Sequence, residues 1–152
     1  MKRLSVLLAG IIVIATASVA DTSHVMLSAD AVSWGDAPPI LPKGAKLAVL
    51  SGDPGKEGAF VIRLKMPAGY RIAPHWHPTD EHVTVLKGTF ALGMGDTPDQ
   101  IQAQSLPVGG YALLPATMHH YAIAKTAVTV QVFGMGPFVL NYVNPADDPS
   151  KK

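Results

Sequence analysis

The stretch that decides the fold of this chain runs from Gly69 to Gly88 and reads GYRIAPHWHPTDEHVTVLKG. His75 and His77 stand one residue apart, so in a strand, whose side chains alternate between two faces, both imidazoles lie on the same face. Glu81 follows four residues later, and the next strand can return its carboxylate to that point. Neutral imidazoles with a carboxylate suit divalent first-row metals. The stretch therefore predicts a metal site inside a β-structure.

Short apolar runs separated by Gly- and Pro-containing turns flank this stretch. Residues 60–66 alternate between apolar positions and Arg63 or Lys65, and residues 128–133 alternate in the same way. We expect strands at 47–50, 60–66, 82–86, 89–94, 111–114, 121–124 and 128–133. Many short strands with regular turns are typical of a sandwich or barrel. The pattern predicts an all-β domain with very little helix.

The spacing of the central stretch resembles the first motif of the cupin superfamily. That motif is a Gly, five residues, His-x-His, three or four residues, a Glu, six residues and a Gly. Its fixed positions are met by Gly69, His75, His77, Glu81 and Gly88. The resemblance implies a jelly-roll barrel, the double-stranded β-helix, with a metal bound inside it. The stretch is also similar to small exported single-domain cupins and to the cupin domain of zinc-binding anti-sigma factors.

The second cupin motif is met in part. Three of its positions fit: Gly109, Pro115 and His120. Thr117 stands where a turn Gly is expected, and Ala124 stands where an Asn is expected. The resemblance implies that His120 is the fourth metal ligand. A changed turn at Thr117 could shift the register by one residue, so His119 stays an alternative, and the apolar character of Tyr121 on the same face as His119 favours it.

The resemblance implies a divalent metal ion, Fe, Mn, Zn, Ni or Co, held by His75, His77, Glu81 and His120. We expect an apolar cavity beside it, suited to a small flat or aliphatic ligand, lined by Ile62, Leu64, Met66, Val83, Val85, Ala122, Val130 and Val132. Such a site fits a metal-dependent oxygenase or oxidase of a small molecule. The alternative is a non-enzymatic protein that binds or senses a metal or a small molecule. Because ligating imidazoles must be neutral, metal binding is expected to weaken below about pH 6.5.

The first twenty residues have the pattern of a signal peptide. Lys2 and Arg3 precede an apolar run over residues 4–15, and Ser18 and Ala20 are the small residues that signal peptidase requires. We therefore expect cleavage after Ala20 and a secreted or periplasmic protein, with no membrane association after cleavage. The expected organisation is signal peptide 1–20, covering arm 21–45, cupin barrel 46–145 and tail 146–152.

Composition and charge limit the partners. The chain has 152 residues, a formal net charge of +1 and no Cys, which excludes thiolate metal sites, disulfides and thiol nucleophiles. A charge so close to neutral gives no electrostatic basis for nucleic-acid binding. A homodimer is expected, because a barrel whose ligands face inward turns other side chains outward: Trp76, Thr84, Leu86, Tyr121 and Ile123.

Overall fold

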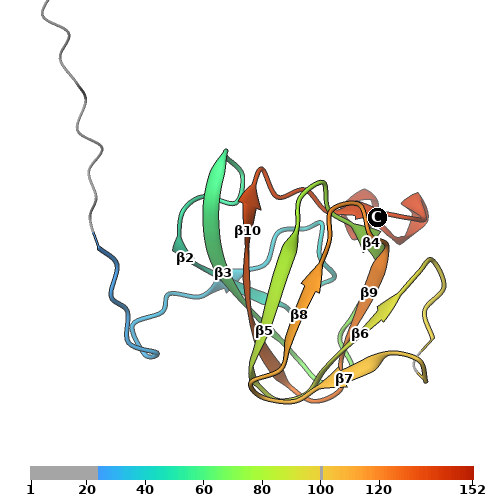
Figure 1. Ribbon diagram of the computed structural model, residues 1–152, viewed down its shortest axis with the longest axis horizontal. Coiled ribbons are helices and arrows are strands. Elements are labelled where there is room, and N and C mark those ends of the chain that lie inside the picture. The colour runs from blue at the N-terminus through green and yellow to red at the C-terminus, as the bar shows by residue number, and fades with distance from the viewer. Residues whose placement is uncertain (1–23, 100) are drawn as a thin grey trace, which may run out of the picture.

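The computed structural model describes residues 24–99 and 101–152 (Figure 1), so the expected signal peptide lies outside the described residues. The strands are β1 (Gly35–Asp36), β2 (Lys46–Ser51), β3 (Gly58–Met66), β4 (Arg71–Trp76), β5 (Glu81–Lys87), β6 (Phe90–Met94), β7 (Gln104–Leu106), β8 (Tyr111–Leu114), β9 (His120–Ala124), β10 (Val128–Gly136) and β11 (Asn141–Tyr142). Two single-turn 3-10 helices follow them, Pro145–Asp147 and Pro149–Lys151. No helix among the described residues is long and apolar enough to span a membrane.

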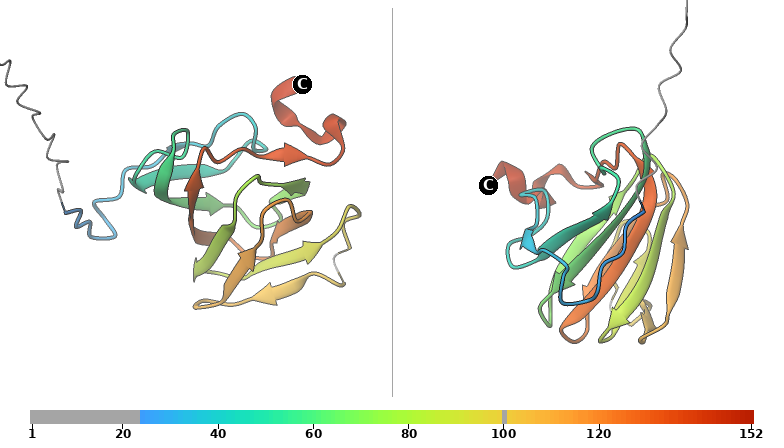
Figure 2. Two further views of the ribbon diagram at one scale, coloured as in Figure 1. Left: turned by 45° about the horizontal axis from the view of Figure 1, so that its top comes forward. Right: turned by 90° about the vertical axis from the view of Figure 1, so that its left-hand side faces the viewer.

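The strands form two antiparallel sheets that pack face to face. One has the order β1-β2-β3-β10-β5-β8 and the other the order β11-β4-β9-β6-β7. Figure 2 shows the two layers from the side, with the C-terminal turns lying beyond the sheet edges. From β3 to β6 and again from β7 to β11, consecutive strands alternate between the sheets, as in a jelly roll. The predicted all-β jelly-roll architecture is confirmed.

The core between the sheets follows from period-2 alternation. β3 and β10 pair directly, with Leu64 opposite Val130 and Ile62 opposite Val132, and all four side chains are buried. Arg63 on β3 faces away from the core and donates a hydrogen bond to the side chain of Gln131 on β10. Each buried aliphatic side chain contributes about 1.5–3 kcal/mol relative to an exposed one, so these two central strands stabilise the frame that carries the site.

The expected covering arm contributes a strand to the six-stranded sheet. β1 pairs with the start of β2, and the intervening loop, residues 37–45, lies beside the barrel. Val32 and Ala45 are buried, and the Lys65 ammonium lies 3.8 Å above the ring of Trp34. The arm therefore packs against its own barrel.

Two residues predicted to face outward are buried. Tyr121 and Ile123 are only 2% and 4% exposed, in a small cluster with Ala91 and Ala103 on the outer side of the five-stranded sheet. The Tyr121 hydroxyl donates to the carbonyl of Asp99 at 2.6 Å, so the connection between β6 and β7 covers this face. Strand periodicity identifies the face of a side chain, but it does not reveal a loop that folds over that face.

The turn before β9 keeps the shape that the cupin motif requires. Thr117 has a φ of 65°, in the left-handed region that favours glycine, and its N–H donates to the carbonyl of His77 at 2.8 Å. Because a β-branched residue adopts the conformation of the missing glycine, the register is not shifted. The turn therefore delivers His120, and not His119, to the interior of the barrel.

This strained turn predicts a stabilising substitution. A non-glycine residue at positive φ costs about 1–3 kcal/mol, and glycine adds about 0.5–1 kcal/mol of unfolded-state entropy. We expect Thr117→Gly to raise the free energy of unfolding by about 1 kcal/mol in urea denaturation. The control is Ala116→Gly in the same turn, where φ is not positive and a loss is expected. A loss of stability in Thr117→Gly would contradict the strain.

Candidate metal centre

Four predicted residues come together from both sheets at one end of the barrel. His75 lies on β4 and pairs directly with His120, the first residue of β9. His77 follows β4 immediately, and Glu81 opens β5 in the opposite sheet, where it pairs with Leu114. The short connection between β4 and β5 crosses from one sheet to the other, which is how a carboxylate four residues after His77 returns to the imidazoles.

The four side chains converge on a buried point. His75, His77 and His120 each offer a ring nitrogen within 4.8 Å of the other two, and all three residues are buried. The Glu81 Oε2 atom lies 3.3 Å from the Nε2 of His120 and 3.6 Å from the Nε2 of His77. Two atoms that are each about 2.1 Å from a shared ion lie about 3.0–3.4 Å apart. These separations are close to those of ligands around one ion.

Backbone carbonyls orient each imidazole. The Nδ1 atoms of His75, His77 and His120 lie 2.8, 2.8 and 2.9 Å from the carbonyl oxygens of Ala73, Val139 and Met118. A carbonyl can only accept, so Nδ1–H donates in each case. In the neutral ring, Nε2 is then left with a free lone pair. Second-sphere bonds of this kind fix the tautomer in metal sites.

The resulting arrangement fits a cation. Among the described residues, the Nε2 atoms of His77 and His120 are buried without a hydrogen-bond partner. They face the Glu81 carboxylate, which is also an acceptor. Facing lone pairs in a buried site repel one another unless a proton or a metal ion lies between them. The donor set, three imidazoles and one carboxylate, is one that first-row metals accept.

Burial favours the neutral form of His75 and His77. Burial, together with the neighbouring His120 and His77, lowers the pKa of His75 to about 3. Burial also lowers the pKa of His77, although Glu81 opposes that shift. For Glu81, burial raises the pKa, but the close contact with the His120 ring and the nearby imidazoles outweigh it, and the net pKa is lowered. Because protons compete less well for these two imidazoles, we expect metal binding to weaken at a pH lower than the roughly 6.5 expected from the sequence, and this stays a prediction.

The site opens into an apolar cavity of about 310 Å³. Ile62 and Leu64 line it as predicted, and Phe138 stacks on the His77 ring at a centroid distance of 4.1 Å. A hollow of about 30 Å³ continues deeper between the sheets, bounded by predicted residues: Leu64, Met66, Val83, Ala122, Val130 and Val132. Val85, also predicted, lines neither space. Nine further residues that the sequence did not identify line the larger cavity: Pro38, Ile40, Leu41, Leu47, Pro54, Gly55, Ile72, Phe138 and Leu140.

The other histidines of the region lie away from the site. His119 faces solvent, where its Nδ1 lies 2.6 Å from the carboxylate of Asp96. His82 lies on the outer face of β5, with its Nδ1 2.7 Å from the Tyr111 hydroxyl. The structure therefore brings His120 to the site, and the alternative ligand His119 is not placed there.

Comparison with known families is in accord with this geometry. The ChrR Cupin-like domain family matches residues 22–138. The chain belongs to this family. The resemblance to cupins, and to the cupin domain of anti-sigma factors, is therefore confirmed. A comparison with curated proteins finds no match.

Solved structures similar to this member of the ChrR Cupin-like domain family share its fold. They include the polyketide cyclase RemF from Streptomyces resistomycificus, with a TM-score of 0.68 and 17% identity over 85% of this chain and 92% of that one. A candidate acetylacetone dioxygenase from Methylibium petroleiphilum PM1 has a TM-score of 0.65 and 20% identity over 86% and 88% of the two chains. An RmlC-like cupin from Shewanella frigidimarina has a TM-score of 0.59 and 15% identity over 76% and 94%. At these identities, the likeness shows the cupin fold alone.

The lowered pKa of His75 predicts acid sensitivity of the metal-free protein. An unfolded His titrates near 6.5, so between about pH 6.5 and 3 the unfolded chain binds a proton that the folded chain does not. We expect the free energy of unfolding to fall as the pH falls, by about 1 kcal/mol per pH unit averaged between pH 7 and 5 for this one group. Urea denaturation in EDTA between pH 7 and 5 measures it.

The variant His75→Gln isolates this contribution. It should reduce the slope of unfolding free energy against pH by about 1 kcal/mol per pH unit between pH 7 and 5. His119→Gln is the matched control, because it removes a histidine that faces solvent. A free energy that does not change from pH 7 to 5, or equal slopes in the wild type and His75→Gln, would contradict the burial argument.

Proposed function

We propose that this protein binds a divalent metal through His75, His77, Glu81 and His120 and acts as an oxygenase or oxidase of a small, largely apolar molecule. The observation that supports this most is the convergence of buried Nε2 lone pairs and a carboxylate on the floor of an apolar cavity. A metal held by four protein ligands, when it prefers six, keeps positions for a substrate and O₂. Fe, Mn, Co or Ni would therefore supply redox or Lewis-acid chemistry there, whereas Zn can be satisfied by four ligands.

The residues around the site favour oxidation or binding over hydrolysis. Among the described residues that line the 310 Å³ cavity, the titratable side chains are His75, His77 and Glu81, all of them proposed ligands. The remaining walls are aliphatic, aromatic or proline side chains, which exclude water and orient an apolar body. Hydrolysis would call for a further acid or base at the cavity wall.

The named neighbours support the choice only in part. One is described as a candidate dioxygenase and another as a polyketide cyclase, so one fold carries different chemistries. We therefore base the proposal on the cavity and its ligand set.

A second candidate is a binding or sensing module, in which occupancy of the metal or the cavity alters a contact with another protein. Membership of the ChrR Cupin-like domain family favours it, since the resemblance extends to the cupin domain of anti-sigma factors. The two candidates share the same metal centre and differ in whether bound substrate is turned over.

Metal loading and oxygen consumption separate the candidates. We expect anaerobic protein to take up one Fe(II) per chain, and His120→Ala to lower that affinity by about 100-fold because a ligand is lost. His119→Ala, the neighbouring histidine, should bind as the wild type does. Oxygen uptake with β-diketones, phenols or thiols, recorded with an oxygen electrode, would support the oxygenase. Metal loading without uptake, and equal ligand binding by Zn(II) and Fe(II) forms, would favour the sensing module instead.

We also propose that the protein acts outside the cytoplasm, in the periplasm of a Gram-negative source. The basic residues Lys2 and Arg3, the apolar run over residues 4–15 and the small residues before Asp21 support this. In such a compartment, metal supply influences which ion fills the site. A small molecule remains the proposed ligand, and the near-neutral net charge of +1 argues against nucleic acid.

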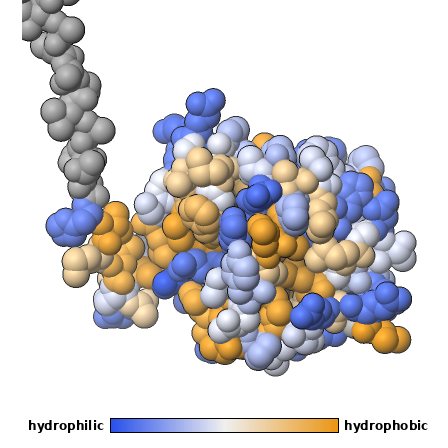
Figure 3. Space-filling view, in the orientation of Figure 1, coloured by the Kyte–Doolittle hydropathy of each residue, from blue (hydrophilic) through white to orange (hydrophobic). Residues whose placement is uncertain are grey.

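We propose a homodimer formed through the outer face of the six-stranded sheet. Phe133 on β10, His82 on β5 and Leu113 on β8 lie in register across this face, and Phe133 and Leu113 are exposed. Tyr111, Leu86 and Met135 add further exposed apolar surface. Figure 3 shows hydrophobic and polar side chains interspersed over the side on which β5 and β8 are seen. Clustered apolar side chains on a sheet face are typical of interfaces.

Introducing positive charge on this face tests the dimer. We expect Leu113→Lys and Phe133→Lys together to convert a dimer mass into a monomer mass in sedimentation equilibrium, because two cations in each chain would be brought into an apolar contact. Ile101→Lys, at an exposed residue of the β6–β7 connection, is the control and should remain dimeric. A monomer mass for the unaltered protein at micromolar concentration would contradict the proposal.

A further inference from the structure

The loop between β1 and β2, residues 37–45, forms one wall of the metal cavity. Its base is closed by a hydrogen bond from the Ala37 N–H to the Ala45 carbonyl, at 3.1 Å. From this base the loop reaches over the end of the barrel. Pro38, Ile40 and Leu41 line the same cavity as three residues of the cluster, His75, His77 and Glu81. A ligand that approaches the metal centre from this end must pass these side chains.

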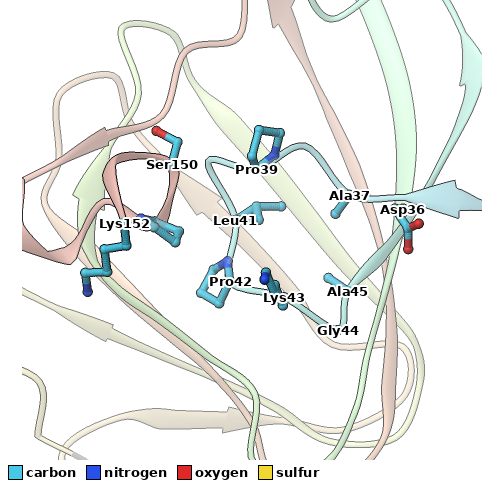
Figure 4. Close-up of a pocket in the computed structure, with 11 residues that line it drawn as sticks. Asp36, Ala37, Pro39, Leu41, Pro42, Lys43, Gly44, Ala45, Ser150 and Lys152 are labelled. Atoms are coloured by element: carbon cyan, nitrogen blue, oxygen red, sulfur yellow. The ribbon is translucent and has the colours of Figure 1, made fainter.

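The opposite side of the loop borders open space. A groove of about 860 Å³ lies between the loop and the C-terminal residues Pro149, Ser150 and Lys152. Figure 4 shows the loop residues and the C-terminal residues on two sides of this hollow. Leu41 borders both the groove and the metal cavity. The groove therefore leaves room for the loop to move outward, a motion that withdraws Leu41 from its packing against the core.

Two tyrosine hydroxyls hold the loop against the barrel. Tyr142 on β11 donates to the Ile40 carbonyl at 2.8 Å, and Tyr70, just before β4, donates to the Pro42 carbonyl. Burial raises the pKa of Tyr70, and burial with nearby Asp148 and Asp147 raises the pKa of Tyr142 to about 12. Both hydroxyls therefore keep their protons and remain donors throughout the neutral range.

The composition of the loop suits a segment that moves as a unit. Pro38, Pro39 and Pro42 each have φ fixed by the ring, which limits internal rearrangement. Gly44, near the end of the loop, has a φ of 107°, a conformation that side chains rarely adopt. A stiff tip next to a glycine and held by two side-chain hydrogen bonds is the arrangement of a hinged flap.

We infer that residues 37–45 form a lid that selects ligands for the metal centre by size, with Ile40 and Leu41 limiting the apolar body of the ligand and Tyr70 and Tyr142 holding the lid closed. This inference rests on the proposed function. The walls that surround the lid are apolar, and polar groups lie at the floor. The fitting ligand class is therefore a small molecule with metal-coordinating oxygens at one end and a compact aliphatic or aromatic body at the other.

A homologous series of alkylhydroxamates tests the size limit on the Co(II)-loaded full-length protein. Hydroxamate oxygens coordinate metals, and binding is followed by the visible absorption of Co(II). In Leu41→Ala we expect the affinity ratio of hexanohydroxamate to acetohydroxamate to rise, by about fourfold for each methylene newly accommodated. In Leu41→Trp the ratio should fall by about tenfold or more. Pro39→Ala, which borders only the outer groove, is the matched control and should keep the wild-type ratio.

Association kinetics test the tyrosine contacts. Tyr142→Phe removes the donor to the Ile40 carbonyl and keeps the ring, so stopped-flow rate constants for hydroxamate binding and release should both rise, by about threefold to tenfold. Tyr111→Phe, whose hydroxyl contacts His82 on the outer face, is the control and should leave both rates unchanged. The lid alone would be overturned by the following result: the Co(II) spectrum is intact, Tyr142→Phe binds and releases hydroxamate at the wild-type rates, and all Leu41 variants keep the wild-type affinity ratio. A wild-type protein without a Co(II) spectrum would overturn the proposed function and the lid with it.

Discussion

Three imidazoles and one carboxylate present lone pairs to one another in an apolar interior, and the strands and turns of the fold hold them in that arrangement. Left to themselves, the Glu81 carboxylate and the Nε2 atoms of His77 and His120 would repel, since the distances between them are only 3.3 and 3.6 Å. The carbonyls of Ala73, Val139 and Met118 prevent the imidazoles from turning away, because each accepts the proton of an Nδ1. The free energy that orients the ligands thus comes from hydrogen bonds that the imidazole N–H groups donate to backbone carbonyls. A bound cation would relieve the remaining repulsion.

The parts of the molecule that follow strict alternation could be predicted from sequence. Phe60, Leu64 and Val130 are buried where period 2 requires, and the His-x-His spacing delivers His75 and His77 to one place. The second cupin motif is ambiguous in sequence, because Thr117 replaces the expected Gly and leaves both the normal and the shifted register open. The positive φ of Thr117 settles that choice in favour of His120. That the four residues ligate a metal stays a prediction.

Segments without periodicity could not be predicted in the same way. Ile40 and Leu41 lie in a Pro-rich loop, and nothing in a weakly patterned stretch indicates which cavity its apolar side chains will line. The burial of Tyr121 shows the same limitation. It lies over Gly93, its partner on β6, where a Cβ would come within 2.0 Å of the tyrosine ring. That pairing of glycine and tyrosine is visible only after the register of β6 and β9 is known.

The strands that carry the proposed metal ligands and the loop at residues 37–45 differ in rigidity, and this difference matters for function. The floor is built from strands β4, β5 and β9, whose hydrogen-bonded ladders fix the ligands before any metal arrives, so little ordering entropy opposes metal binding. The wall at residues 37–45 depends on a two-residue strand and two tyrosine hydroxyls, so it opens at smaller cost. A turnover enzyme benefits because products must leave, and a sensor benefits because lid position reports occupancy. A preformed set of metal ligands behind a movable lid therefore suits either proposed function. Because the lid residues line the cavity, their sequence, more than the metal ligands, determines which molecule is recognised.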